Sequence, residues 1–243
     1  MPVLLIRLAG PMQSWGIVSR FSHRDTACEP SKSGVIGLLC AALGAPRDDD
    51  DTVARLAALP MGVRVNREGV PGTDFQTIGG GTIAGAAYGV ARAQGASGGT
   101  LLSYRDYLAD ADFLVGFESA DDRWLRRLDA ALRRPRWPLY LGRRSYVPAV
   151  APAAGVTMVS LGEALRDTSV PPAPAALRLV LEGPPGRGEP RYDVPLSFHP
   201  QRRAFGLRYV TTSWVPVHAP ARVARPVPSE SEPAVSPGPP GHL

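Results

Sequence analysis

A chain of 243 residues, 44% of them hydrophobic, is long enough to bury one large core or two smaller ones. Its net charge of +5 permits a nucleic-acid partner without requiring one. Apolar runs stay below the roughly 18 residues of a membrane span, and no basic region precedes an apolar core at the N-terminus, so we expect neither membrane segment nor signal peptide. The cysteines, Cys28 and Cys40, have no metal-ligand spacing; we expect them to be reduced, which is typical of a cytoplasmic protein.

The chain opens with an almost continuous apolar run over residues 3–9, which predicts a strand buried on both faces. Gly10 and Pro11 end this strand, and Gln13 and Trp15 follow on a loop. We interpret Trp15 either as a lid on the core or as a platform on which a base stacks. Both interpretations stay open from the sequence.

A polar arm over residues 19–29 leads to an apolar helix predicted at residues 34–44. Ser33 is the expected N-cap and Gly44 the expected C-terminal stop. Because nearly every face of this helix is apolar, it should be buried. Free amides in its first turn, beside Lys32, would make an anion site, and the alternative is a core helix whose lysine is solvated.

The acidic run at residues 48–51 precedes a helix predicted at residues 52–59, whose N-terminus the carboxylates would stabilise; a metal site is the weaker alternative. Residues 61–66 alternate as a second strand. Residues 69–99 are rich in glycine, alanine and threonine. Residues 75–78 and 101–104 are expected to form the legs of a long hairpin with its tip at residues 79–98, and a disordered surface loop is the alternative.

Beyond this segment the sequence predicts a strand at residues 113–117 and an amphipathic helix at residues 121–133. A tight loop at residues 135–148 combines a glycine, two arginines and a tyrosine, residue types that bind phosphate and stack on bases. A short helix at residues 161–165, a linker at 171–174, and strands at 177–182 and 192–196 follow. Proline, serine and glycine dominate the end of the chain, so residues 220–243 are expected to be disordered.

Several of these segments occur in the order typical of one family: "LIRLAGPMQSWG", the polar arm, "PSKSGVIGLLCAALG", the acidic loop, "SYRDYLADADFLVGF" and "RPRWPLYLGRRSYVP". In this order the chain resembles the CasD subunits of type I-E Cascade, the CRISPR surveillance complex, which are CRISPR-associated RAMP superfamily proteins. The resemblance runs from Met1 to about Trp214. It is weak between Ala84 and Gly99 and ends before about Pro220.

The resemblance implies an α+β fold with an RRM-like, ferredoxin-like core, a protruding β-hairpin thumb and a small C-terminal β region. The core would comprise residues 1–68 and 104–150, and the thumb residues 69–103. The C-terminal β region would comprise residues 151–219, followed by the disordered proline-rich tail at residues 220–243.

The resemblance also implies a non-catalytic, cytoplasmic subunit of a ribonucleoprotein complex in antiviral defence, which binds and bends the 5′ handle of the crRNA. Its thumb would contact the backbone subunit and its body the large subunit. Target DNA would be met only through the assembled complex, and no cofactor, metal or membrane is implied. The expected RNA-binding residues are Gln13, Trp15, Arg24, Lys32, Ser33, Gln76, Tyr104, Arg105, Arg143, Arg144 and Tyr146.

Two alternatives belong to other classes of function. The first is a metal-independent endoribonuclease that processes CRISPR repeat RNA, for which His23, Lys32 and Tyr146 would be the acid-base candidates. The second is a general single-strand RNA binder that works outside any complex. We expect instead that the isolated chain binds RNA poorly, because its basic groups are dispersed along the sequence.

Overall fold

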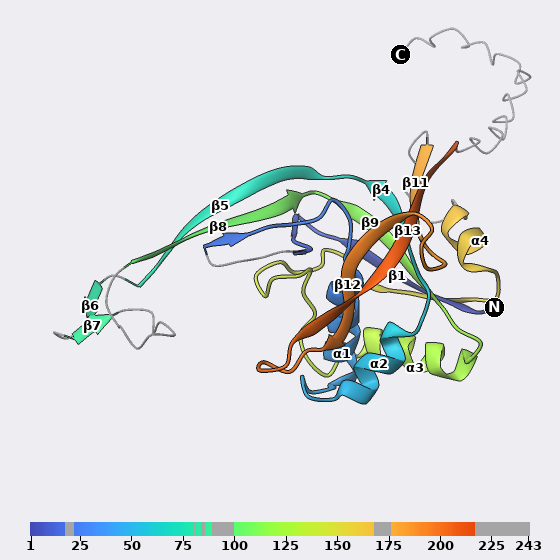
Figure 1. Ribbon diagram of the computed structural model, residues 1–243, viewed down its shortest axis with the longest axis horizontal. Helices are drawn as coiled ribbons and strands as arrows, with labels where there is room; N and C mark the ends of the chain where they lie inside the picture. The colour runs from blue at the N-terminus through green and yellow to red at the C-terminus, as the bar shows by residue number, and fades with distance from the viewer. Residues whose placement is uncertain (18–21, 80, 84–85, 89–99, 168–175, 217–243) are drawn as a thin grey trace, which may run out of the picture.

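The computed structural model describes residues 1–17, 22–79, 81–83, 86–88, 100–167 and 176–216. Its central feature is a curved sheet of seven strands, in which every neighbouring pair is antiparallel (Figure 1). The strand order is β10 (Ala153–Thr157), β1 (Val3–Ala9), β9 (Asp112–Glu118), β4 (Met61–Arg67), β11 (Ala176–Gly183), β13 (Ala204–Pro216) and β12 (Glu189–Ser197).

The chain order of one part of this sheet identifies its fold. Apart from a second helix and the strands that lie outside this sheet, the chain runs from β1 through α1 (Lys32–Leu43), β4, β9 and α3 (Asp122–Arg133) to β10, which is a βαββαβ succession. In the sheet these four strands take the order β10-β1-β9-β4, that is fourth, first, third, second. This is the ferredoxin-like arrangement, so the expected RRM-like core of an α+β protein is confirmed.

Both faces of the central strands are covered, which explains why the first strand is apolar almost throughout. Leu4, Ile6 and Leu8 belong to the larger core cluster, on the face that α1 and α3 cover. Val3 and Leu5 point to the other face, where α4 (Leu161–Arg166) packs on β1, β4 and β9. Successive side chains of a strand point to opposite faces, so a strand between two apolar layers needs apolar residues at every position.

The helix α1 is buried, as its apolar faces predict, but it begins earlier than expected. Its N-cap is Ser31, whose side chain makes no capping hydrogen bond, so the assignment of Ser33 as N-cap is wrong. Gly44 ends the helix in the left-handed conformation with φ 75°, as predicted. A β-carbon at Gly34 would lie 2.8 Å from Cε3 of Trp15, so this glycine lets the indole pack against the helix.

The acidic run serves the following helix. The N-cap of α2 (Asp50–Ala57) is Asp49, whose side chain accepts a hydrogen bond from the backbone N–H of Thr52 at 2.9 Å. This hydrogen bond lowers the pKa of Asp49. The helix starts two residues before the predicted one, and its first turn carries Asp50 and Asp51. The predicted stabilisation of a helix N-terminus by these carboxylates is therefore confirmed.

A second sheet projects from the body as a long ribbon (Figure 1). Its long strands are β5 (Val70–Ile78) and β8 (Leu101–Ala109), which pair antiparallel from Val70↔Ala109 to Ile78↔Leu101. This register confirms the predicted hairpin legs, and we call the pair the β5–β8 ribbon. Beyond it, β6 (Gly81–Ile83) pairs with β7 (Ala86–Tyr88), and the rest of the predicted tip lies outside the described residues.

The base of the ribbon is widened by two short strands. β2 (Met12–Gln13) pairs antiparallel with the end of β8, and β3 (His23–Arg24) pairs parallel with its middle, His23 opposite Tyr104 and Arg24 opposite Arg105. The polar arm is thereby held against the ribbon. Among the described residues, no helix is long and apolar enough to cross a membrane.

The predicted C-terminal strands exist, and they extend the core sheet. β11 pairs with β4 from Arg178↔Val65 to Leu181↔Gly62, and β13 and β12 continue the sheet beyond it. β10 and α4, also assigned to the C-terminal region, pack against β1. The residue boundaries of the separate regions therefore remain a prediction. The predicted linker and proline-rich tail lie outside the described residues.

Candidate nucleic-acid interface

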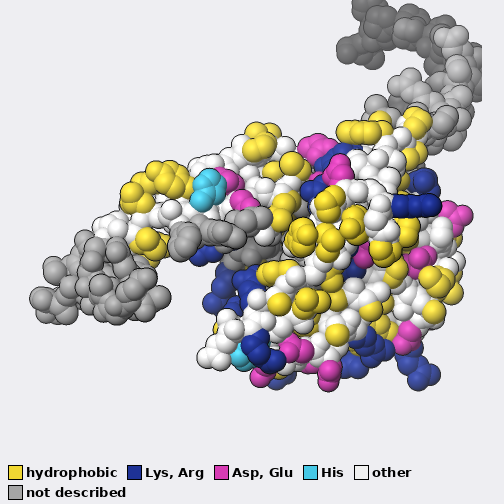
Figure 2. Space-filling view, in the orientation of Figure 1, with side chains coloured by type: hydrophobic (Ala, Val, Ile, Leu, Met, Phe, Trp, Pro, Cys, Tyr) yellow, Lys and Arg dark blue, Asp and Glu magenta, His cyan; other side chains and the backbone are white. Residues whose placement is uncertain are grey.

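A cavity of about 610 Å³ lies where the base of the β5–β8 ribbon meets the body. Its wall is assembled from the loop after β2, the arm around β3, the start of α1, β8, the loop after α3 and the β12–β13 hairpin. In Figure 2, basic side chains lie on the side of the body that faces the ribbon. Segments far apart in the sequence thus contribute to one concave site.

The charges that line this cavity are mostly positive. Among the described residues, four arginines take part: Arg24, Arg105, Arg143 and Arg203. Asp25 and Asp193 also line it. Asp193 is neutralised by a two-point ion pair with Arg208, and Asp25 accepts a hydrogen bond from the backbone N–H of Ile17. A concave surface with an excess of guanidinium groups attracts and neutralises phosphate.

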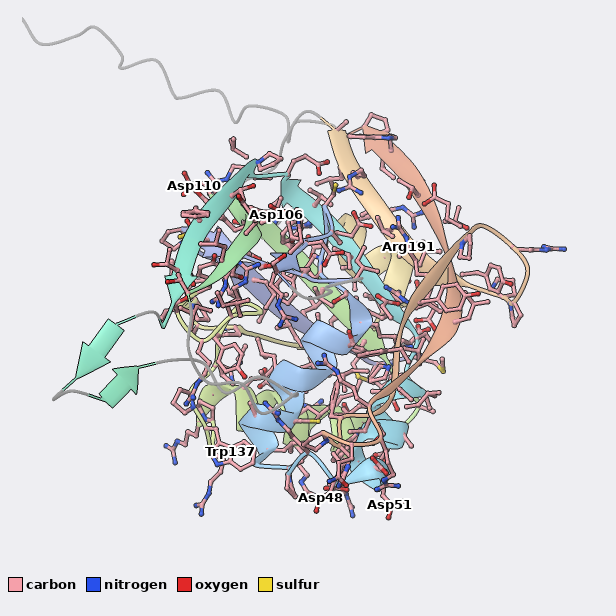
Figure 3. The ribbon with its side chains drawn as sticks, turned by 60° about the vertical axis from the view of Figure 1, so that its left-hand side comes forward. Asp48, Asp51, Asp106, Asp110, Trp137 and Arg191 are labelled. Atoms are coloured by element: carbon pink, nitrogen blue, oxygen red, sulfur yellow. The ribbon has the colours of Figure 1, made fainter. Side chains whose placement is uncertain are left out.

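The arm that carries Arg24 is tied to the ribbon through Asp106, whose side chain is labelled on β8 in Figure 3. One carboxylate oxygen of Asp106 contacts Nε2 of His23 at 2.7 Å, and the other accepts from the hydroxyl of Thr73 at 2.7 Å. The hydrogen bond with His23, followed by that with Thr73, lowers the pKa of Asp106. The backbone N–H of Tyr104 also donates to the carbonyl of Ser22 at 2.8 Å.

Arg143 binds three segments around the cavity to one another. Its guanidinium donates to the carbonyl of Arg24 at 3.1 Å, to the carbonyl of Asp106 at 2.9 Å and to the hydroxyl of Tyr146 at 2.9 Å. Its neighbour Gly142 has φ +88°, and a β-carbon there would lie 1.7 Å from the carbonyl oxygen of Ser14. The glycine in this loop is therefore required for close backbone approach.

Tyr146 and Trp15 are buried rather than exposed for stacking. Burial raises the pKa of Tyr146, whose hydroxyl contacts Arg143 and Asp74. Trp15 borders the cavity, but only 1% of it is exposed, and its indole N–H donates to Gln13. The interpretation of Trp15 as a lid on the core describes its position better than that of an open stacking platform.

Gln13 is also an internal residue. Its amide group donates to the carbonyls of Leu8 at 3.0 Å and Ala111 at 2.7 Å, so it satisfies backbone acceptors at the ends of β1 and the β8–β9 turn. The expectation that Gln13 lines the RNA-facing surface is not met in this arrangement. A buried amide with all its partners inside the protein fixes the loop and offers nothing to a ligand.

Lys32 departs most from its expected role, because only 1% of it is exposed. Its ammonium group donates to both carboxylate oxygens of Glu182 at 3.0 and 2.8 Å. Its backbone N–H donates to Asp193 at 2.7 Å, so a carboxylate of the chain already occupies the start of α1. Burial lowers the pKa of Lys32, and Glu182 opposes this effect. The predicted anion site at Lys32 is corrected to an internal ion pair, while the neighbouring Ser33 does line the cavity.

The remaining predicted residues do not line the cavity. Gln76 is half-buried on β5, opposite Ser103. Tyr104 is exposed on β8 with its ring centroid 5.3 Å from that of Phe75. Arg144 is exposed beside Arg143. These three side chains would meet a ligand only if it extended from the cavity onto the ribbon or the loop.

Sequence reasoning missed the contribution of the β12–β13 hairpin to the cavity, which consists of Tyr192, Asp193, Phe198, Arg203 and Phe205. No local motif marks these positions. The available signal was a pair of arginines followed by an aromatic residue at 202–205, a combination that is common on ordinary strand surfaces. Only the tertiary pairing of β12 and β13 with the core sheet brings them next to Ser33 and Arg24.

The three residues considered for RNA cleavage have different hydrogen-bonding partners. His23 contacts Asp106, Lys32 is paired with Glu182 inside the body, and Tyr146 contacts Arg143 and Asp74. Within the described part of the chain, no group of three or more histidine, cysteine, aspartate or glutamate residues is arranged to hold a metal ion. The geometry around the cavity is suited to binding an anionic chain.

Comparisons with known proteins find CRISPR-associated relatives. The family model described as CRISPR-associated protein (Cas_Cas5) matches residues 3–211. The Cascade subunit CasD of Escherichia coli (strain K12) is 35% identical over 159 residues, which are 58% of this chain and 65%, just under two thirds, of that protein. A solved chain from a CRISPR RNA-guided surveillance complex has 36% identity and a TM-score of 0.75, over 90% of this chain and 95% of that one. A crystal structure of a Cas protein has 42% identity and a TM-score of 0.68, over 88% and 95%.

Proposed function

Because this chain belongs to the Cas5 family of CRISPR-associated proteins, we propose that it is a non-catalytic subunit of a Cascade-type surveillance complex. In this role it binds and bends the 5′ handle of the crRNA. One observation carries the proposal: the cavity collects Arg24, Arg105 and Arg143 from three separate segments. A site of this kind neutralises consecutive phosphates of a bent single strand.

The β5–β8 ribbon supports a contact with a neighbouring protein subunit. It projects from the body and carries exposed Phe75, Leu102 and Tyr104. Large apolar side chains on a projecting element are typical of protein–protein contacts. We assign this ribbon to the backbone subunit and the body to the large subunit of the complex. Target DNA is then met only through the assembled complex.

The proposal assigns no bond cleavage to this chain. The separate partners of His23, Lys32 and Tyr146 favour binding over the alternative of a metal-independent endoribonuclease. Purified protein incubated with CRISPR repeat RNA in EDTA is therefore expected to give no discrete product. A specific product that is lost in a His23→Ala or Tyr146→Phe variant would establish the endoribonuclease instead.

The binding site is tested in the assembled complex with the substitutions Arg24→Gln and Arg105→Gln. Each substitution removes a guanidinium that lines the cavity. The contacts of Arg24 that hold the arm come from its backbone, and the side chain of Arg105 donates one hydrogen bond, to Ser103, so neither substitution should disturb the fold. We expect each variant to bind crRNA more weakly. The slope of the logarithm of the binding constant against the logarithm of the salt concentration should become shallower by about 0.7 for each lost phosphate contact. The readout is the crRNA dissociation constant at several salt concentrations.

Arg126→Gln is the matched control, because Arg126 is an exposed arginine on α3 that is paired with Asp122. It removes the same charge from the protein without changing the cavity. Equal losses in Arg24→Gln and Arg126→Gln would show a general effect of net charge and would contradict the proposed site. Normal assembly of crRNA-loaded complexes without this chain would contradict the proposed function itself.

A further inference from the structure

The β12–β13 hairpin places two large aromatic side chains at the edge of the arginine-lined cavity. Tyr192 on β12 is 66% exposed and Phe205 on β13 is 37% exposed, and both line the cavity. The guanidinium carbon of Arg203 lies 5.2 Å from the centroid of the Phe205 ring. Aromatic rings left in contact with water beside several cations provide the stacking surface that single-stranded nucleic acids use.

The hairpin holds these rings on a rigid support. Next to Tyr192, the carboxylate of Asp193 pairs with Arg208 across the hairpin at 2.6 and 2.9 Å, and it accepts the first backbone N–H of α1. Phe198 packs against α1, where a β-carbon at Gly37 would lie 4.0 Å from its Cζ. Because the support is fixed before a ligand arrives, little ordering of the protein is needed for stacking.

The size and charge of the cavity select the kind of ligand. Its volume of about 610 Å³ is in the range of sites for small molecules, so it admits a nucleotide or two and not a double helix. Arg24, Arg105 and Arg143 come from elements outside the hairpin, so one part of the lining offers charge and another offers aromatic rings. An unpaired nucleotide has the matching pair of groups, a phosphate and a flat base.

We propose that Tyr192 and Phe205 form a stacking surface for one unpaired base of the bound RNA, while the arginines of the cavity hold the phosphates beside it. Arg203 supports the Phe205 ring from its face. This inference rests on the proposed function, since the RNA is the crRNA that the cavity binds. It adds the β12–β13 hairpin to the site and assigns it the recognition of a base rather than of the backbone.

Fluorescence of 2-aminopurine tests the inference in the complete complex. The probe replaces one handle nucleotide at a time, and stacking on an aromatic ring quenches its emission. We expect strong quenching at one position with the natural protein, and recovery of emission at that position with Tyr192→Leu and with Phe205→Leu. The loss of a stacked base corresponds to a decrease in crRNA affinity of about 5- to 150-fold.

Two further variants separate stacking from folding and from charge. Tyr192→Phe keeps the ring and should keep the quenching. Trp214→Leu removes another aromatic residue of β13, 64% exposed and outside the cavity lining, and should leave both quenching and affinity unchanged. Because the leucine variants remove no cation, their affinity for crRNA should depend on salt concentration as steeply as that of the natural protein. The affinity of Arg24→Gln should depend on it less steeply.

The outcomes distinguish the two proposals. Unchanged quenching in Tyr192→Leu and Phe205→Leu, together with weaker binding in Arg24→Gln, overturns the stacking surface and leaves the proposed function standing. No change of emission at any handle position, together with unaltered binding in every arginine variant, overturns both. Recovery of emission in the two leucine variants and not in Trp214→Leu supports the assignment.

Discussion

Lys32 is the only lysine of the chain, and the fold places it inside the protein. A buried ammonium group loses its hydration, and it is tolerated here because Glu182 accepts two hydrogen bonds from it. Asp193 accepts a further hydrogen bond from the backbone N–H of the same residue. The same cluster joins the start of α1 to β11 and β12. At the scale of the residue, Lys32 therefore positions the helix that presents Ser33 and Gly34 to the cavity.

Substitution of Lys32 by Ala tests this internal role. It leaves the carboxylate of Glu182 without its main partner, so we expect the free energy of unfolding to decrease by about 3–5 kcal/mol. Urea unfolding measures the change. Arg133→Ala, which breaks an exposed ion pair with Asp129, should cost less than about 0.5 kcal/mol. A loss for Lys32→Ala no larger than that of the control would show that the ion pair contributes little to stability.

The two cysteines differ in environment, and their reactivity should differ accordingly. Cys28 is exposed and Cys40 is buried in α1, where burial raises the pKa of its thiol to about 12. A thiol-specific chromogenic reagent should modify Cys28 in the native protein and reach Cys40 only after unfolding. Rapid modification of Cys40 in the native protein would contradict the buried position of this helix.

The raised pKa of Cys40 also predicts a dependence of stability on pH. The unfolded chain releases the thiol proton above about pH 8.5 while the folded chain keeps it, so stability decreases as pH rises above that value. Between about pH 9 and about pH 11, the natural protein should lose roughly 1 kcal/mol per pH unit more than Cys40→Ala does. Urea unfolding at both pH values measures the difference. Equal slopes for the two proteins would contradict the prediction.

At the scale of the element, the short strand β3 depends on one side chain of β8. β3 has only His23 and Arg24, far too few residues for a stable strand by itself. Asp106 holds it through His23, and Arg143 holds the carbonyl of Arg24. The position of Arg24 in the cavity thus depends on residues that do not line the cavity themselves, such as His23.

Asp106→Ala is expected to loosen this arm. The variant loses the contact with His23, so the backbone N–H of Tyr104, which donates to Ser22, should exchange with deuterium faster. The control is Asp48→Ala, which removes an exposed carboxylate beside α2, away from the arm, and should leave the exchange at Tyr104 unchanged (Figure 3). Because the folded protein lowers the pKa of Asp106, the contact is complete above about pH 4 and is lost as pH falls further. Unchanged exchange at Tyr104 in the variant would show that β3 is held by other contacts.

At the scale of the whole molecule, one sheet connects the ferredoxin-like core with the C-terminal strands. β11 pairs with β4 on one side and with β13 on the other, and Val180 and Val210 belong to the same core cluster as β1 and α1. The cavity lies between this extension and the base of the ribbon. The C-terminal strands are thus needed both for the core and for the site.

Truncation of the chain tests this continuity. A chain that ends at Gly183 lacks β12 and β13, so it loses one of the two antiparallel partners of β11 and the Asp193 carboxylate at the start of α1. We expect it to lose the cooperative thermal unfolding transition. A chain that ends at Pro216 keeps every described strand and is the control. A cooperative transition at an unchanged temperature in the shorter chain would show that β12 and β13 are not needed for the folding of the core, and would contradict this continuity.

The sequence alone determined those features that depend on neighbouring residues. The apolar run of β1, the all-apolar helix that ends at Gly44, the acidic cap of α2 and the two legs of the β5–β8 ribbon follow from local patterns of hydrophobicity, caps and glycines. The arginines at 24, 105 and 143 are predicted to bind RNA because they stand in motifs that resemble a known family, and the structure places all three at one cavity.

Only the tertiary structure decided which polar residues line the cavity and which are buried inside the protein. Lys32 and Arg143 both look like surface cations in the sequence, but Glu182, 150 residues further along the chain, takes Lys32 into the interior. The aromatic side chains of the β12–β13 hairpin reach the cavity because β11, β13 and β12 add to the edge of the core sheet. Such pairings depend on residues distant in the sequence, and no local pattern of hydrophobicity or charge specifies them.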